Sequence, residues 1–326
     1  MATIAAKMKD EGVDIINFSV GEPDFNTPKH IIEAGQTAMD QGYTKYTAGP
    51  GMIEFRRAIS NKLLKENGVE VNLDEILVSN GEKQSLYTTC QALFDKGDEV
   101  LVCQPYWVSF PEFVRLSDAE PIFINTVSKN NFEPDFNNLH SKITRNTKGI
   151  IINSPSNPTG GVWSEEALIK LLYIAKKQGL IVISDECYER IIYEGEFKST
   201  EKINRENNIN AIVITCMSLS KTYAMTGWRI GYSFGPKKII SAMSKLQGQA
   251  TSCANSIGQM AGIAALRSRQ DCVQEMIKLF RERRDLMVSL LNQLPKISCA
   301  NPRGAFYAFP DFSAYLNKNV NGKLLK

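Results

Sequence analysis

Short apolar runs rich in β-branched residues recur through the chain, separated by helical patterns. They span residues 76–80, 99–104, 149–155, 180–186, 211–218 and 229–235. Most are apolar on both faces, which is typical of strands that helices cover on either side of a mainly parallel sheet. The pattern therefore predicts one buried sheet that includes these strands.

The clearest predicted helix begins after Ser164, whose hydroxyl can cap it, and ends at Gly179. Glutamates occupy its first turn, where the helix dipole favours negative charge. One face is apolar and consists of Leu168, Leu171, Leu172 and Ala175. Strand, capped helix and strand follow one another here, so the fold class is α/β.

After Arg267 the pattern changes to one long helix that ends near Pro295. Its predicted inward side consists of Val273, Ile277, Phe280, Met287, Leu290 and Leu294. The segment 296–312 that follows predicts a pair of strands interrupted at Gly304.

Composition indicates a soluble globular enzyme without a polyanionic partner. The 326 residues are 43% hydrophobic and 22% charged, with a formal net charge of +3. No apolar run could span a bilayer and no signal core opens the chain, so we expect a cytoplasmic protein that binds neither membrane nor nucleic acid. Seven scattered cysteines and two histidines give no pattern for a disulfide framework or a metal site.

One catalytic motif is a chance match. Residues 231–235 fit G-x-S-x-G, but a hydrolase of that kind needs a later histidine, and both histidines come earlier. The serine also lies inside a predicted strand instead of at a strand-to-helix turn. The chain has no GxGxxG and no GxxxxGK[ST], so dehydrogenase and P-loop functions lack their phosphate cradle.

Four other segments follow predicted strands, where an open α/β sheet builds its ligand crevice. They are PYW (105–107), NSPSNPTG (153–160), SDECY (184–188) and SLSKTYAMTGWRIGY (218–232). Taken singly, the first segment is an ordinary aromatic of the core, the second a turn, the third the end of a strand and the fourth a loop with an exposed lysine. Together and in this order they indicate a site for one cofactor.

With GEPDF (21–25), TKYTAGPG (44–51) and GAFY (304–307), these motifs resemble the class I pyridoxal-phosphate-dependent aminotransferases, and within them the bacterial-type aspartate aminotransferases. The resemblance covers essentially the entire chain. It implies a large cofactor-binding domain in residues 25–285 with a mainly parallel seven-stranded sheet. A smaller α+β domain would combine residues 1–24 and 286–326 and be incomplete at the C-terminus.

The resemblance also implies roles around the cofactor ring. Lys221 would form a Schiff base with the cofactor aldehyde and then carry a proton. Asp185 would keep the pyridinium nitrogen protonated, because a carboxylate favours the charged ring. Asn157 and Tyr188 would donate hydrogen bonds to the phenolic oxygen, and Trp107 would stack on the ring. Lys221, Asp185 and Tyr188 are thus the expected catalytic residues.

Phosphate binding is expected at a helix N-terminus, through the backbone amides of Gly81, Glu82 and Lys83. Arg229 would add a bidentate guanidinium and Ser218 a hydroxyl. By the same resemblance, Tyr46 would reach the phosphate of a neighbouring subunit. This implies a homodimer with composite active sites.

Substrate contacts implied by the resemblance are Gly21, Trp107, Asn157 and Lys83. Lys83 matches a lysine that binds a distal carboxylate in some members, although an exposed lysine in a first helical turn is nearly as good an interpretation. The arginine with which the family holds the substrate α-carboxylate is expected beyond Lys326, since Arg303 does not match its position.

The function implied is transfer of an amino group between aspartate or glutamate and a 2-oxo acid such as 2-oxoglutarate. Alternatives on the same fold are a glutamate–prephenate, aromatic or kynurenine aminotransferase, or a C–S lyase. A non-catalytic, truncated relative that only dimerises or binds cofactor is a further alternative.

Overall fold

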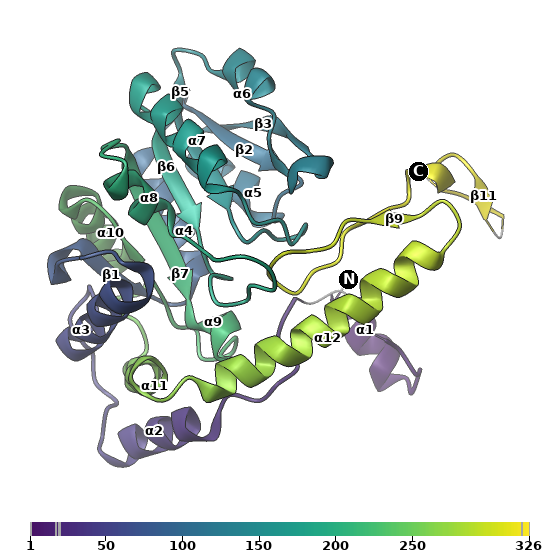
Figure 1. The fold of residues 1–326 in the computed structure, drawn as a ribbon. Helices are drawn as coiled ribbons and strands as arrows, with labels where there is room; N and C mark the ends of the chain where they lie inside the picture. The colour runs from purple at the N-terminus through teal and green to yellow at the C-terminus, as the bar shows by residue number, and fades with distance from the viewer. Residues whose placement is uncertain (1, 17, 19–20, 321, 326) are drawn as a thin grey trace.

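The computed structural model describes residues 2–16, 18, 21–320 and 322–325, and its centre is an eight-stranded sheet (Figure 1). Met1 and Lys326, the outer bounds of the predicted small domain, lie outside the described residues. The strand order is β1-β8-β7-β6-β5-β2-β3-β4. The strands are β1 (Ile76–Ser79), β2 (Glu99–Gln104), β3 (Glu120–Val127), β4 (Glu133–Pro134), β5 (Thr147–Asn153), β6 (Ile181–Asp185), β7 (Ile212–Ser218) and β8 (Gly231–Phe234).

Strands β7, β6, β5, β2 and β3 run parallel, while β8 is antiparallel to both β7 and β1. The register pairs Asn153 of β5 with Asp185 of β6, and Asp185 with Cys216 of β7. The carboxyl ends of these three strands therefore meet at one edge of the sheet, where a ligand crevice forms.

Every strand that the apolar pattern predicted is present, with ends that differ by up to two residues. The pattern missed β3 and the two-residue β4. The apolar run of β3 covers only residues 121–124 and is followed by the polar residues Asn125 and Thr126, so half of this strand carries no apolar pattern.

Helices surround the sheet and cover both of its faces, and the first of them packs on the last. They are α2 (Lys29–Asp40), α3 (Ile53–Lys62), α4 (Glu82–Leu93), α5 (Ser109–Arg115), α6 (Phe136–Lys142), α7 (Glu165–Gln178), α8 (Thr200–Glu206), α9 (Leu219–Thr222), α10 (Lys237–Ala250) and α11 (Ser256–Arg267). Single helical turns lie at Leu63–Asn67, Leu73–Glu75, Ser128–Asn130 and Ser313–Tyr315. Along β5, Ile150 and Ile152 pack under α7, whereas Ile151 joins the core under α4, α5 and α10.

The capped helix predicted after Ser164 is α7. Ser164 Oγ accepts a hydrogen bond from the Ala167 amide at 3.1 Å, and Gly179 ends the helix with a φ of 69°. Its four predicted apolar residues are all buried. None of the described helices has the length and apolar content needed to cross a membrane.

The long helix α12 (Asp271–Gln293) confirms the predicted element, but its predicted inward side is wrong in the second half. Val273 and Phe280 are buried, whereas Met287, Leu290 and Leu294 are 39%, 53% and 46% exposed. The reason is that this half of α12 extends beyond the sheet and its covering helices (Figure 1). Apolar spacing marks a helix face but does not say whether anything covers it.

Beyond α12, β9 (Ser298–Cys299) pairs antiparallel with β10 (Pro310–Asp311), as the sequence predicts. The bend between them bridges Ile192 at Gly304, where a Cβ would lie 2.9 Å from the Ile191 carbonyl oxygen. This close approach carries Phe306 and Tyr307 to the strand ends. The chain also contains α1 (Ala2–Asp10) and the hairpin of β11 (Asn319–Val320) with β12 (Lys323–Leu324).

Candidate active site

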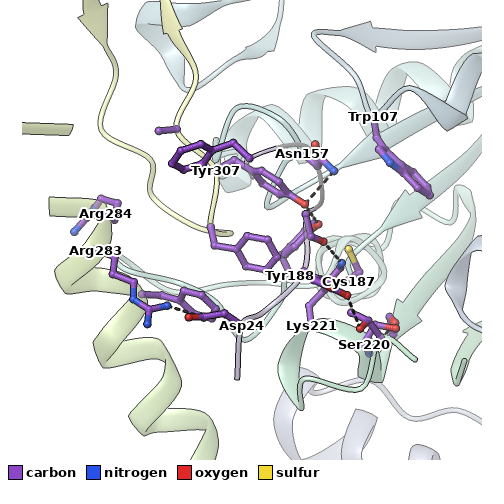
Figure 2. Close-up of a pocket in the computed structure, with 18 of the residues that line it drawn as sticks. Asp24, Trp107, Asn157, Cys187, Tyr188, Ser220, Lys221, Arg283, Arg284 and Tyr307 are labelled. Atoms are coloured by element: carbon purple, nitrogen blue, oxygen red, sulfur yellow. Dashed lines mark hydrogen bonds and ion pairs between the residues drawn. The ribbon is translucent and has the colours of Figure 1, made fainter. Parts of the chain in front are cut away.

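A cavity of about 1210 Å³ opens at the carboxyl ends of the parallel strands (Figure 2). All but two of the predicted site residues line it: Gly21, Glu82, Lys83, Trp107, Asn157, Asp185, Tyr188, Ser218, Lys221 and Arg229. Gly81 adjoins the lining at Glu82. Tyr46 lies elsewhere, on the surface.

Lys221 projects into this cavity from α9, which begins directly after β7. Ser218 Oγ caps that short helix by accepting a hydrogen bond from the Ser220 amide at 3.0 Å. Lys221 Nζ donates to the Gly21 carbonyl oxygen at 2.6 Å. Burial lowers the pKa of Lys221, against a smaller opposing effect of Cys187, Glu82 and Glu22. A lowered pKa makes the neutral, nucleophilic amine more accessible.

Asp185 ends β6 and is 3% exposed. Its Oδ1 accepts a hydrogen bond from the Cys187 amide at 3.2 Å. Burial raises the pKa of Asp185, while hydrogen bonds from Glu82 and Cys187 act in the opposite direction. The sheet register therefore fixes a carboxyl group in the dry wall of the cavity.

Asn157 and Tyr188 converge on a third residue, Tyr307, whose part in the site the sequence reasoning missed (Figure 2). The hydroxyls of Tyr188 and Tyr307 are 2.6 Å apart, and Asn157 Nδ2 donates to the Tyr307 hydroxyl at 3.2 Å. Burial raises the pKa of both tyrosines, so both keep their protons at neutral pH. Asn157 and Tyr188, which are both predicted to bond the phenolic oxygen of the cofactor, thus both bond the phenolic hydroxyl of Tyr307 in this structure.

The structure brings together the residues of the predicted phosphate site at the N-terminus of α4. Gly81 caps the helix with a φ of 78°, and a Cβ there would clash with the guanidinium of Arg229. A Cβ at Gly231 would clash with the amide nitrogen of Glu82, so β8 also packs directly against the helix start. Arg229 has a φ of 55° and donates to the Thr226 carbonyl at 2.8 Å. Backbone amides and a guanidinium therefore share one anion-binding corner.

Trp107 lies on another wall of the cavity. Its ring packs edge-to-face on Phe110 and Phe113, with centroids 5.5 Å and 6.0 Å away. Lys83 Nζ lies 4.8 Å from the Trp107 ring centroid, and both residues line the cavity. Lys83 is exposed to solvent but faces the site.

Tyr46 is 87% exposed and makes no part of this cavity. Within this chain it is not brought to the other residues, so its contact with a neighbouring subunit stays a prediction.

Sequence reasoning also missed two arginines of α12 that line the cavity (Figure 2). Arg283 pairs with Asp24 at 2.7 Å, and Arg284 pairs with Glu194 at 2.9 Å. Both follow buried Phe280 by three and four residues, so they lie on the same side of the helix. This spacing from Phe280 is the feature of the sequence from which both arginines could have been predicted to face the site.

Several known proteins are similar to this chain in sequence and in fold. The profile of the family described as aminotransferase class I and II matches residues 13–326. The chain is 42% identical to the probable aspartate/prephenate aminotransferase of Aquifex aeolicus over 321 residues, 97% of this chain and 81% of that protein. It is 42% identical to an aspartate aminotransferase of Bacillus sp. strain YM-2, over 96% of this chain and 80% of that protein.

A solved aspartate aminotransferase from Thermus thermophilus with maleate superposes with a TM-score of 0.92 at 38% identity. The match covers 98% of this chain and 83% of that one. Similarity therefore extends through both the sequence and the fold. The chain belongs to the aminotransferase class I and II family, whose members transfer amino groups with pyridoxal phosphate.

Proposed function

We propose that the chain is an aspartate aminotransferase that moves an amino group between aspartate or glutamate and a 2-oxo acid such as 2-oxoglutarate. The observation that carries this proposal is the meeting of Lys221, Asp185 and Arg229 in one cavity. The names of the Bacillus and Thermus relatives support aspartate as the substrate. Lys83, exposed at the cavity, supplies a cation for a distal carboxylate.

The residues present fit pyridoxal phosphate. Gly81, whose Cβ would fill the space against Arg229, leaves backbone amides and a guanidinium free to hold a phosphate. Lys221 faces the same cavity with a lowered pKa, as a lysine that attaches to an aldehyde needs. When bound, the cofactor supplies an electron sink for the substrate Cα.

Each of the surrounding side chains has its own role in this proposal. Lys221 Nζ would hold the cofactor and, once freed by the substrate amine, would take the proton from the substrate Cα. Asp185 would hold a proton on the ring nitrogen, because a carboxylate favours the charged ring. Asn157 and Tyr188 donate to the phenolic oxygen, a pairing supported by their convergence on the Tyr307 hydroxyl.

The proposal also includes the division of the chain into domains, its assembly and its location in the cell. We divide the chain into a large domain of residues 25–285 and a small domain of residues 1–24 and 286–326, with α12 running unbroken through the boundary. Exposure of Tyr46 supports its proposed reach to a partner's phosphate in a homodimer. The free state of all seven cysteines supports a cytoplasmic location.

The test of the cofactor site is borohydride reduction of the purified protein with pyridoxal phosphate, followed by peptide mapping. We expect the stable adduct on Lys221, and none in Lys221→Ala. Lys83→Ala is the matched control, because it removes another lysine of the same cavity and should leave the adduct in place. An adduct on another lysine contradicts the proposal.

Substrate preference is tested separately in a coupled assay that compares aspartate and aromatic amino acids as amino donors, and prephenate as an amino acceptor. We expect the highest kcat/KM for aspartate with 2-oxoglutarate. Lys83→Met should lower kcat/KM for aspartate by about 10-fold, the effect of losing one charged hydrogen bond, and leave that for alanine unchanged. Preference for prephenate would favour the activity named for the Aquifex relative.

A further inference from the structure

Glu82 carries a buried carboxyl group that the proposed function does not use. It is the first residue of α4, and phosphate binding would employ only its backbone amide. Its side chain points into the protein: the residue is 8% exposed and lines the cavity. Among the described residues its Oε1 has no hydrogen-bond partner at close distance, and the groups near enough to offer one are the Asp185 carboxyl and the Cys187 thiol.

That neighbouring carboxyl belongs to Asp185. One side-chain oxygen each of Glu82 and Asp185 and the Sγ of Cys187 all lie within 4.8 Å of one another, and all three residues are buried. Two carboxylates this close, away from water, cannot both be ionised, because burial and like charge act together. One proton must therefore be shared between them.

The surroundings decide which carboxyl carries that proton. The other titratable and charged groups that act on the pair or on Lys221 are Glu22, Cys187, Tyr188, Cys216, Lys221, Arg229 and Tyr307. Lys221 is the cation that acts on both carboxyls, and its Nζ is already bonded to the Gly21 carbonyl.

Asp185 has a backbone donor, the Cys187 amide, whereas the Oε1 of Glu82 has none. Burial and the charge of Asp185 raise the pKa of Glu82 well above its ordinary value, against smaller opposing effects of the Cys187 thiol and the charge of Lys221. The N-terminus of α4 favours a charged Glu82, but a helix end acts more weakly than full burial beside a like charge. The proton therefore belongs on Glu82.

We propose that Glu82 is a positioning residue: as a neutral acid it donates a hydrogen bond to Asp185 and so keeps the Asp185 carboxyl ionised. This inference rests on the proposed function in one respect, that Asp185 serves the ring nitrogen of the cofactor. The pair then presents a single negative charge, oriented by the Cys187 amide on one side and by the Glu82 acid on the other.

Two substitutions separate this role from a charged or merely space-filling one. Glu82→Gln keeps a neutral donor of the same shape, whereas Glu82→Met keeps the volume and removes the donor. Glu166→Gln is the matched control, because Glu166 also lies in a first helical turn, on α7, but is exposed.

The first measurement is the infrared difference spectrum between each variant and the unmodified protein at neutral pH, with pyridoxal phosphate bound. Difference spectra cancel the bands of other carboxyls. We expect Glu82→Gln to remove one protonated-carboxyl band, and Glu82→Met to keep such a band because Asp185 then takes the proton. Glu166→Gln should change only the region of ionised carboxylates.

The second measurement is the dissociation constant of pyridoxal phosphate by equilibrium dialysis. We expect near-unchanged binding for Glu82→Gln and about 10-fold weaker binding for Glu82→Met, the effect of losing one hydrogen bond to a charged group. Both experiments are repeated with a chelator, which should change neither result.

Loss of an ionised-carboxylate band in Glu82→Gln, equal weakening in both variants, or a change caused by the chelator would each overturn the inference. If Glu82→Met does not fold, the infrared result for Glu82→Gln decides alone. Failure of the unmodified protein to bind pyridoxal phosphate would instead count against the proposed function, and the spectrum of the cofactor-free protein would still test the proton on Glu82.

Discussion

Glu186 gives the sharpest prediction about stability. It follows Asp185 in the chain, is 1% exposed and lies behind the active-site wall. Its Oε1 accepts hydrogen bonds from the Ser184 hydroxyl and the Thr200 amide, both at 2.9 Å, whereas Oε2 has no partner in the part of the chain that the structure describes. Burial outweighs these bonds and raises the pKa of Glu186 from 4.5 to about 7.

Proton linkage determines whether the Glu186 carboxyl makes the folded protein more or less stable as the pH rises. The folded protein binds this proton more tightly than the unfolded chain, so the associated stability is present below pH 4.5 and is lost as the pH rises through 7. A difference of about 2.5 pH units, at about 1.4 kcal/mol each, makes the whole effect about 3.5 kcal/mol. About 2.5 kcal/mol of it falls between pH 5 and pH 8.

Glu186→Gln removes the titration and keeps the acceptor for Ser184 and Thr200. We expect the unfolding free energy of the unmodified protein, measured against that of the variant in urea with saturating pyridoxal phosphate, to fall by about 2.5 kcal/mol from pH 5 to pH 8. Glu196→Gln is the control, because Glu196 is exposed and should give a constant difference. Parallel stability curves for Glu186→Gln and the unmodified protein would refute the reasoning.

Three predictions concern the site itself. Asp185→Ala should slow single-turnover amino transfer by about 100-fold or more, and Trp107→Phe by less than about 10-fold, because a smaller ring still stacks; similar losses would contradict the role of Asp185. Gly81→Ala should weaken pyridoxal phosphate binding by about 10-fold in equilibrium dialysis, because its Cβ displaces the Arg229 guanidinium. Tyr307→Phe should lower the urea unfolding free energy of the cofactor-free protein by about 1 kcal/mol, since its hydroxyl bonds two neighbours.

Local sequence determined the elements that bury both faces or carry their own start and stop signals. Residues 99–104 form β2 as predicted, and Ser164 and Gly179 bound α7. The polar segments after the strands also lie at the cavity, because parallel strands bring their carboxyl ends to one edge. For this reason the resemblance carried by those motifs located most of the candidate site.

Tertiary packing decided which residues far apart in the sequence come into contact. Tyr307 meets Asn157 across 150 positions, and Glu82 meets Asp185 through the packing of α4 on the sheet, although neither pairing leaves a periodic signal in the sequence. The same helical spacing that buries Phe280 leaves Leu290 exposed, because the sheet and its covering helices reach only the first half of α12. Periodicity reports the conformation of one element and its apolar face, whereas protonation, burial and contact depend on which other elements come to lie against it.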